Sequence, residues 1–317
     1  MLRKLFFIGT WELAIKQFIS RHTRFHQFDW RKQGASSYIP KAGWWNYSRH
    51  YIKKPSLEAI NLDIDTHFSI EGYDRTMNSK NIFRDLLRSF YFNGGESLMG
   101  ARVSGSPKKK NEGWKISAGG KDLIGEKIIY ASGRGLEDIR NDKTAVKVVA
   151  SPLLVVYPAL SEQCYVRMTP FYDKTVNHLS HSFKGDNYSL IGGGYFADPN
   201  STDSMDDAVT KLKAMAKKVF PNLKDSTIVE SYFSYKTEYV PKFGERNYKY
   251  KLQELDDGLY SVIPGKYSLA FSLAAHTFTR LTGKNPPMVN PGYTSYKVDE
   301  GIISLMKAEK IIARKCS

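Results

Sequence analysis

The sequence predicts an α/β fold of two interleaved domains, and three observations lead to this class. Residues 5–29 have the pattern of an apolar strand, a small residue, an amphipathic helix and a second strand. Residues 258–283 repeat the order of strand, glycine-containing turn and helix, with Gly283 as the helix-ending glycine. Between them, residues 145–196 form apolar segments with short connections, which are typical of antiparallel strands. We therefore expect the two ends of the chain to build one domain around a β-rich insert.

Length and composition indicate a folded protein. A chain of 317 residues with 41% apolar and 13% aromatic residues can bury one large core or two joined ones. No stretch approaches the roughly 18 continuous apolar residues of a membrane span. The apolar run after Arg3 and Lys4 is too short, and too soon followed by Glu12, for a signal peptide. Cys164 and Cys316 form no metal or disulfide pattern, so we interpret the protein as cytoplasmic.

The chain is strongly basic. It carries 47 Lys and Arg against 32 Asp and Glu, a formal net charge of +15. This charge attracts polyanions such as nucleic acid, anionic lipid or a phosphate-bearing cofactor. The lysines are scattered apart from residues 107–110 and 307–315, which favours an ordinary solvated basic surface.

The opening segment has part of a dinucleotide-binding turn. In such a turn, glycines let the backbone approach a pyrophosphate at a helix N-terminus, and an acid about 20 residues later binds the ribose. Gly9 and Asp29 match one glycine and the acid. Because the other glycines are missing, two interpretations stay open: a reduced dinucleotide-binding turn, or an ordinary βαβ unit with an exposed acid. The helix between them has its apolar face at Trp11, Ala14, Ile15, Phe18 and Ile19.

Further helices follow from apolar periodicity. One is predicted over residues 79–92, with Ser79 as N-cap. Others are predicted over residues 205–219, 268–282 and 301–314. The helix over residues 79–92 is expected to bury a stripe made of Ile82, Phe83, Leu86, Leu87 and Phe90.

Three strands are predicted before the central insert, at residues 97–105, 113–119 and 126–133. The second and third are expected to be joined by a hairpin at residues 119–122. A later strand is predicted within residues 226–241.

Five segments, taken in order, form a recognisable pattern. They are "GASSYIPKAGWWN" (34–46), "NGGESLMGARV" (93–103), "KIIYASGRG" (127–135), "YSLIGGGYF" (188–196) and "LYSVIPGKYSLAFSLAAH" (259–276). Together they resemble the D-amino-acid-oxidase-like family of FAD-dependent oxidoreductases. The resemblance covers nearly the whole chain. It implies a discontinuous FAD/NAD(P)-binding Rossmann-like domain, an antiparallel β-sheet substrate domain, FAD as cofactor, and oxidation of an amine or amino-acid-like small molecule.

The resemblance also implies domain boundaries and site residues. The FAD-binding domain would comprise residues 1–55, 80–150 and 255–317, and the substrate domain residues 56–79 and 151–254. Lys236 would anchor a substrate carboxylate with Tyr235 beside it, and these are the expected catalytic residues. The cofactor would be bound by Gly9, Asp29, Ala35, Ser36, Ser37, Val103, Ala131, Ser132, Gly133, Gly265, Lys266, Tyr267 and Ser268.

The chain departs from the family pattern in two loops. The opening turn is shortened, and the closing loop keeps Gly265 but has Lys266, Tyr267 and Ser268 where the family has further glycines. Lys266 offers a cation to a phosphate or to the flavin, where reduction builds negative charge.

Two alternatives to a flavin enzyme remain. One is a relative that keeps the fold without catalysis. The other is a nucleic-acid-binding protein that stacks bases on aromatic side chains such as Trp44 and Trp45 along a basic groove. No metal site is expected, because strand alternation puts His178 and His181 on opposite faces.

Overall fold

The structure, a computed structural model, describes residues 3–10, 67–76, 79–111, 113–136, 146–167, 175–239, 250–265, 267–287, 297–298 and 306–316. The chain divides into two compact units. Unit 1 comprises Met1–Ile82, Ala150–Ser234 and Leu305–Ser317, and unit 2 comprises Phe83–Val149 and Tyr235–Ser304. Both units contain helices and sheets, so the predicted α/β class is confirmed.

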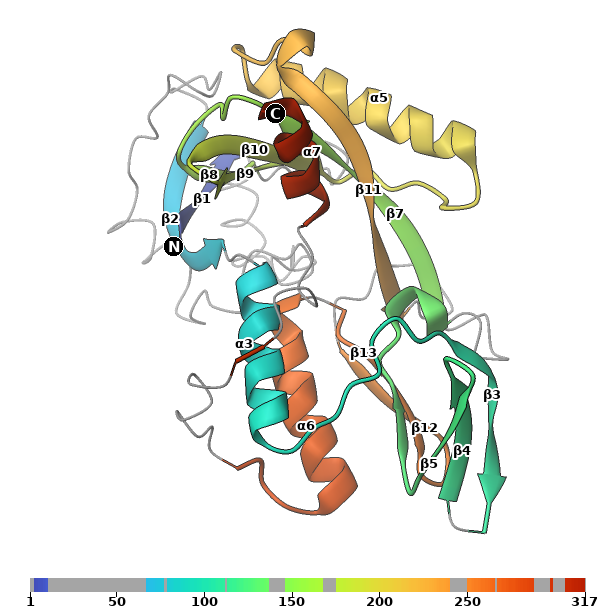
Figure 1. Ribbon diagram of the computed structural model, residues 1–317. Coiled ribbons are helices and arrows are strands. Elements are labelled where there is room, and N and C mark those ends of the chain that lie inside the picture. The colour runs from blue at the N-terminus through green and yellow to red at the C-terminus, as the bar shows by residue number, and fades with distance from the viewer. Residues whose placement is uncertain are drawn as a thin grey trace, which may run out of the picture. The chain divides into compact units, whose positions relative to one another are not determined.

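Unit 1 is organised by a seven-stranded sheet with the strand order β11-β7-β10-β9-β8-β1-β2 (Figure 1). In chain order its strands are β1 (Arg3–Thr10), β2 (His67–Thr76), β7 (Val146–Val156), β8 (Cys164–Arg167), β9 (Val176–Phe183), β10 (Asp186–Gly193) and β11 (Ile228–Tyr239). β8, β9 and β10 pair antiparallel in sequence, and β10 pairs antiparallel with β7, as their short connections predict. β1 pairs parallel with β8 and antiparallel with β2.

Two helices cover the apolar residues of this sheet. α5 (Thr202–Val219) packs Leu212 and Ala216 against Leu154 and Ile191. It begins three residues before the predicted start because the Ser201 side chain accepts a hydrogen bond from the Ser204 amide and caps it. α7 (Lys307–Cys316) forms a separate core with β7 and β10 through Ala308, Ile311, Ile312, Val155, Tyr188 and Leu190.

The two histidines of β9 face opposite sides of the sheet, as predicted. His178 is fully buried and its Nε2 lies 2.7 Å from Ser189 Oγ. His181 stacks on Tyr188, the residue next to Ser189 on β10. Because neighbouring strand residues point to opposite faces, the two imidazoles cannot bind one metal ion together.

Unit 2 contains two three-stranded sheets. The first has the order β3-β4-β5, from β3 (Val103–Lys110), β4 (Gly113–Ala118) and β5 (Lys121–Gly125). The second has the order β12-β13-β6, from β6 (Ile128–Tyr130), β12 (Lys251–Asp256) and β13 (Leu259–Ile263). β13 pairs parallel with β6, and Leu259 lies opposite Ile128, which comes 131 positions earlier in the chain.

The predicted pairing of the early strands is wrong in two places. Gly119 and Gly120 both have positive φ, 57° and 77°, and form a two-residue turn into β5 rather than into residues 126–133. The third predicted strand, β6, instead joins β13. β3 begins at Val103, later than the predicted 97–105 strand, and accommodates Pro107 at a register shift between Ser104 and Lys108.

The core of unit 2 joins its two sheets. Trp114 of β4 packs with Tyr130, Leu136, Val146, Leu259 and Ile263. Its indole Nε1–H donates a hydrogen bond to the Asp257 carbonyl at 2.9 Å. This contact ties the turn before β13 to β4.

α3 matches both of its predicted bounds, and α6 ends where predicted. α3 occupies Ser79–Phe92. α6 occupies Ala270–Thr282 and begins two residues after the predicted start at 268, because the 3₁₀ turn η4 (Tyr267–Leu269) precedes it. Gly283 ends α6 with φ 69°, and its amide donates to the Thr279 carbonyl at 2.9 Å, as expected of a helix-ending glycine.

The predicted burial of the α3 stripe is wrong. Leu87 is only 8% exposed, but Phe83, Leu86 and Phe90 are 46%, 51% and 46% exposed. An apolar periodicity marks the face that could be buried, but it does not supply a partner for that face.

The two units divide the chain differently from the two domains expected from the sequence. A boundary near residue 150 is common to both divisions. β1, however, lies in unit 1 with β8, β9 and β10, whereas the expected FAD-binding domain groups residues 1–55 with residues 80–150 and 255–317. Which segments hold the cofactor and which hold the substrate stays a prediction. None of the described helices is long and apolar enough to span a membrane.

Candidate functional site

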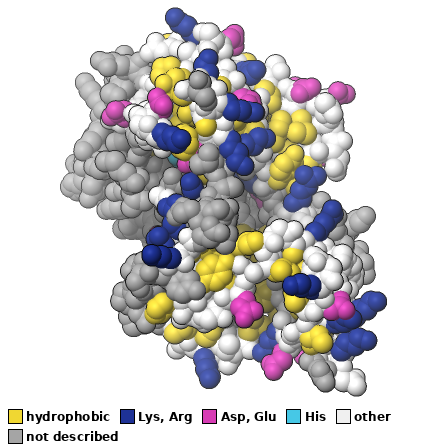
Figure 2. All heavy atoms as spheres, in the orientation of Figure 1, with side chains coloured by type: hydrophobic (Ala, Val, Ile, Leu, Met, Phe, Trp, Pro, Cys, Tyr) yellow, Lys and Arg dark blue, Asp and Glu magenta, His cyan; other side chains and the backbone are white. Residues whose placement is uncertain are grey.

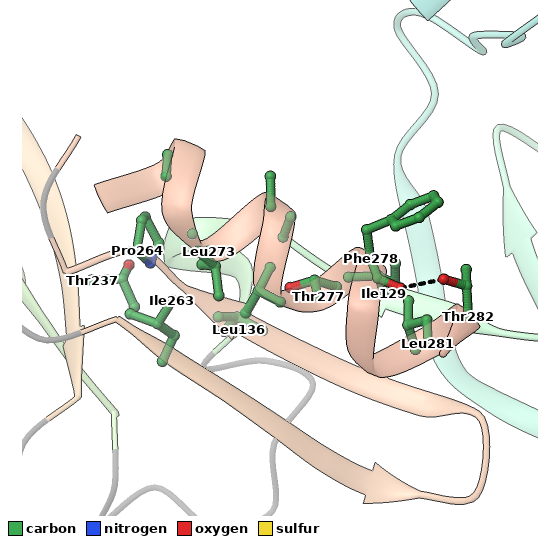
Figure 3. Close-up of a pocket in the computed structure, with 15 residues that line it drawn as sticks. Ile129, Leu136, Thr237, Ile263, Pro264, Leu273, Thr277, Phe278, Leu281 and Thr282 are labelled. Carbon is green, nitrogen blue, oxygen red and sulfur yellow. Dashed lines mark hydrogen bonds between the residues drawn. The ribbon is translucent and has the colours of Figure 1, made fainter. Parts of the chain in front are cut away.

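Unit 2 contains a cavity of about 570 Å³ beside α6 (Figure 3). Its volume and mainly apolar lining are typical of sites for small molecules and cofactors. It is lined by Ile129, Ala131, Gly133, Leu136, Thr237, Val262, Ile263, Pro264, Ala270, Leu273, Ala274, Thr277, Phe278, Leu281 and Thr282.

Two parallel strands bring small residues to this cavity. β6 ends at Tyr130 and is followed by Ala131 and Gly133, and β13 ends at Ile263 and is followed by Pro264. Gly133 has φ 55° and opens the 3₁₀ turn η1 (Gly133–Gly135), and a Cβ placed there would meet no atom within 4 Å. The ends of parallel strands are where α/β sheets bind their ligands, and a glycine in open space lets a ligand approach the backbone closely.

One face of α6 supplies most of the other wall. Leu273 and Thr277 are four residues apart and lie on the side of the helix toward Leu136 and β13 (Figure 3). Leu273 is buried, and Leu136 is fully buried. The wall is therefore fixed by the core of unit 2 rather than by a loop.

The cavity lining contains no charged side chain. Its hydroxyl groups come from Thr237, Thr277 and Thr282. The Thr282 hydroxyl donates to the Phe278 carbonyl at 2.8 Å. The Thr277 hydroxyl is buried and has no hydrogen-bond partner among the described residues, so it is available to a polar atom of a bound molecule.

A buried tyrosine next to the cavity has a raised pKa. Tyr130, the last residue of β6, is buried in the core of unit 2, and burial raises the pKa of its phenol. Its hydroxyl has no hydrogen-bond partner in the described part of the chain. The phenol is neutral at physiological pH and supplies no charge to the site.

Several cations lie next to residues of the lining, and we refer to these positions as the rim of the cavity. Arg134 follows Gly133, and its guanidinium carbon lies 4.6 Å from the centre of the Tyr235 ring. Lys127 donates from Nζ to the Leu281 carbonyl at 2.8 Å, at the C-terminal end of α6. Arg280 pairs with Glu254 at 3.6 Å.

The two expected catalytic residues lie on β11 near the cavity. Neither Lys236 nor Tyr235 lines it, but Thr237 does. Because side chains alternate along a strand, Tyr235 shares the face of Thr237, and Lys236 points to the opposite face. The geometry thus brings Tyr235 toward the cavity and turns Lys236 away from it.

The expected cofactor-binding residues fall into three groups. Ala131 and Gly133 line the cavity with Ser132 between them, and Gly265 and Tyr267 lie between Pro264 of the lining and the start of α6. Val103 begins β3, is 45% exposed and is not part of the lining. Gly9 lies inside β1, opposite Phe68, rather than in a turn after the strand.

The remaining expected residues lie outside the described part of the chain. They are Asp29, Ala35, Ser36, Ser37 and Lys266, together with the side chain of Ser268.

Sequence reasoning missed the threonines and Arg134. Thr277 continues the inward face of α6 four residues after Leu273, and Thr237 lies two residues after Tyr235 on one strand face, so periodicity could have found both. Arg134 and Tyr235 are 101 positions apart in the sequence, so no local pattern predicts their contact.

Comparison with solved structures identifies the architecture. L-Proline dehydrogenase from P. horikoshii matches with a TM-score of 0.62 and 12% identity, over 91% of this chain and 75% of that chain. The FAD-bound, dithionite-reduced L-α-glycerophosphate oxidase from Mycoplasma pneumoniae matches with a TM-score of 0.62 and 14% identity, over 91% and 76%. Glycine oxidase from Geobacillus kaustophilus matches with a TM-score of 0.55 and 15% identity, over 94% and 76%.

The chain has the fold of these oxidoreductases. The fold implied by the sequence resemblance is therefore confirmed. No sequence profile of a known protein family matches the chain, and no curated protein matches it by sequence.

Proposed function

We propose that this protein is an FAD-dependent oxidoreductase that oxidises an amine or an amino-acid-like small molecule. The observation that carries the proposal is the cavity where the parallel strands β6 and β13 end in small residues, within a fold shared with glycine oxidase and L-proline dehydrogenase. Strand ends of this kind bind nucleotide cofactors in α/β proteins.

The residues present fit FAD on two counts. The open space above Gly133 admits a ligand close to the backbone, which a side chain at this position would obstruct. The buried Thr277 hydroxyl offers a hydrogen bond that no described residue takes up. Ala131, Ser132, Gly133, Gly265 and Tyr267 would hold the cofactor on this side.

The sequence supplies the rest of the proposed cofactor site. Asp29 would bind the adenosine ribose, with Ala35, Ser36 and Ser37 following along the same ligand, and Lys266 and Ser268 would contact it from the closing loop. Gly9 and Val103 complete the set implied by the resemblance. These residues are proposed from their place in the sequence pattern.

Bound FAD would supply the acceptor for the two electrons and the hydrogen of a C–H bond beside the substrate nitrogen. The protein's own part is to position that bond and to exclude water. The apolar side chains of Leu136, Ile263 and Leu273 give the site a dry wall, which strengthens any hydrogen bond made inside it. Tyr235 stands at the edge of this wall.

A small molecule, rather than nucleic acid, is the proposed partner. Figure 2 shows Lys and Arg side chains spread over this face of both units with Asp and Glu among them. Several lysines are paired with acids: Lys109 with Asp256 and Asp257, Lys115 with Asp122, Lys211 with Asp207, and Lys217 with Asp225. Paired and interspersed charges support a solvated surface rather than a groove for a polyanion. Within the described part of the chain, Cys164 and Cys316 form no disulfide bond, which supports the proposed cytoplasmic location.

The proposal is tested by anaerobic reduction of protein-bound FAD. The full chain, loaded with FAD, is mixed with a set of amines and amino acids, and the visible absorption of the flavin is followed. Bleaching by at least one of them is expected. α-Glycerophosphate serves as the comparison because its reacting carbon carries oxygen instead of nitrogen.

Two results would change the conclusion. Bleaching by α-glycerophosphate alone would replace the amine by a hydroxyl substrate. A protein that binds FAD but is reduced by none of these compounds would be a relative that keeps the fold without this catalysis.

A further inference from the structure

The cavity cannot itself balance the charge of an ionised ligand. All fifteen lining residues are apolar, glycine or threonine. Placing a carboxylate or phosphate among them without a cation would cost far more than the burial of its apolar part returns. An ionised group of a molecule in the cavity must therefore be held at the rim.

Most rim cations are already engaged. The Lys127 ammonium donates to the Leu281 carbonyl, and Arg280 is paired with Glu254. Lys236 points to the face of β11 opposite Thr237. Lys251 lies over the Tyr239 ring, four residues along the strand from Tyr235.

Arg134 differs from these residues. It is exposed, it directly follows Gly133 of the lining, and no carboxylate among the described residues pairs with it. Its guanidinium lies over the Tyr235 ring, which shares a strand face with Thr237 of the lining. Contact with the ring restricts the flat guanidinium and leaves its N–H groups free to donate.

We propose that Arg134, positioned by the Tyr235 ring, binds the oxyanion of the molecule whose apolar part fills the cavity. This inference rests on the proposed function and names its recognition element. A guanidinium binds carboxylate or phosphate through two parallel N–H donors, so either group satisfies the geometry. The two sources are the carboxylate of an amino-acid-like substrate and the phosphates of the cofactor.

The first experiment compares hexanoate with hexanamide by calorimetric titration of the full chain, with and without FAD. The two compounds share an apolar tail and differ in charge. For a substrate carboxylate, we expect Arg134→Gln to weaken hexanoate binding about tenfold to a hundredfold and to leave hexanamide binding unchanged. Arg134→Lys keeps the charge without the planar fork and is expected to fall between the two.

Three further variants separate binding from positioning. Tyr235→Phe keeps the ring and is expected to bind hexanoate like the wild type, whereas Tyr235→Leu removes the ring and is expected to weaken it. Lys236→Gln tests the carboxylate anchor that the family resemblance implies, and it is expected to weaken hexanoate binding less than Arg134→Gln because Lys236 points to the face of β11 opposite Thr237. Thermal unfolding of each variant verifies that the fold is kept.

The second experiment identifies the source of the oxyanion. FAD and riboflavin are titrated into the wild type and Arg134→Gln. Weaker FAD binding with unchanged riboflavin binding assigns Arg134 to the cofactor phosphates, and weaker hexanoate binding alone assigns it to the substrate.

Arg134→Gln without effect on hexanoate and on FAD overturns the inference, as does an equal loss in Lys236→Gln. A wild-type protein that binds hexanoate through Arg134 but does not bind FAD contradicts the proposed function while supporting this inference.

Discussion

At the scale of single residues, two threonines of the cavity differ in whether their hydroxyl groups are hydrogen-bonded. Thr277 and Thr282 both line the cavity, but only the Thr282 hydroxyl has a hydrogen bond, to the Phe278 carbonyl. The Thr277 side chain is buried, and its hydroxyl has no partner among the described residues. A buried hydroxyl without a partner destabilises the folded state until a ligand satisfies it.

Thr277→Val should therefore raise the free energy of unfolding of the ligand-free protein by about 1 kcal/mol. Valine has the same shape without the hydroxyl. Thr282→Val is the control and should be neutral or destabilising, because it loses a hydrogen bond that exists. Urea unfolding measures both variants, and a loss of stability in Thr277→Val as large as in Thr282→Val would show that its hydroxyl is already satisfied.

Tyr157 makes stability depend on alkaline pH. Its hydroxyl donates to Asp186 Oδ1 at 2.9 Å, and this hydrogen bond is the main reason that its pKa is raised from 10.0 to about 12. Between these two values the folded chain keeps a proton that the unfolded chain releases. The stabilisation is thus complete below pH 10.0 and is lost as the pH rises to about 12.

Tyr157→Phe should accordingly show a shallower fall of stability across that window than the wild type. Urea unfolding at a series of alkaline pH values measures the slope. Burial raises the pKa of Tyr188 and Tyr232 in the same direction, so part of the slope remains in the variant. An unchanged slope would contradict the role of the Asp186 contact.

At the scale of helices and strands, the sequence predicted where a helix begins or ends better than it predicted which segments pair with each other. α3 has its predicted bounds, and α6 ends at its predicted residue because Gly283 stops the helix within the sequence itself. β5 was missed because the turn at Gly119 and Gly120 returns the chain two residues earlier than expected. The pairing of β6 with β13 depends on a contact across more than a hundred residues, which no local pattern contains.

The α3 stripe provides a direct test of burial at this scale. Leu87→Ala should lower the free energy of unfolding by at least about 2 kcal/mol, because this side chain is 8% exposed. Leu86→Ala makes the same change one residue earlier, at 51% exposure, and should stay within about 0.5 kcal/mol. Chemical unfolding compares the pair, and an equal cost at the two positions would mean that the stripe is buried after all.

At the scale of the whole molecule, the sequence predicted the fold class and part of the site. Strands that end in small residues pointed to Ala131 and Gly133, and both line the cavity. Arg134 was not anticipated, because its contact with the Tyr235 ring arises only when the fold brings β11 to the end of β6. The architecture is that of FAD-dependent and related oxidoreductases, and the proposed chemistry depends on FAD binding to this chain.

The N-terminal segment is expected to affect the affinity for FAD. Its strand contains a single glycine, Gly9, so fewer backbone N–H groups are expected to reach the pyrophosphate than in a turn with three. Positive side chains such as Arg134 and Lys266 are expected to contribute part of the attraction. Attraction between exposed charges is screened by salt, whereas backbone hydrogen bonds are screened less.

FAD binding is tested by titration of the full chain with FAD, followed by flavin fluorescence at low and at high salt. We expect saturable binding of one FAD per chain that is weaker at high salt. Tight binding that does not change with salt would contradict the expected contribution of positive side chains to FAD binding. Absence of binding at both salt concentrations would contradict the proposal that this chain is an FAD-dependent oxidoreductase.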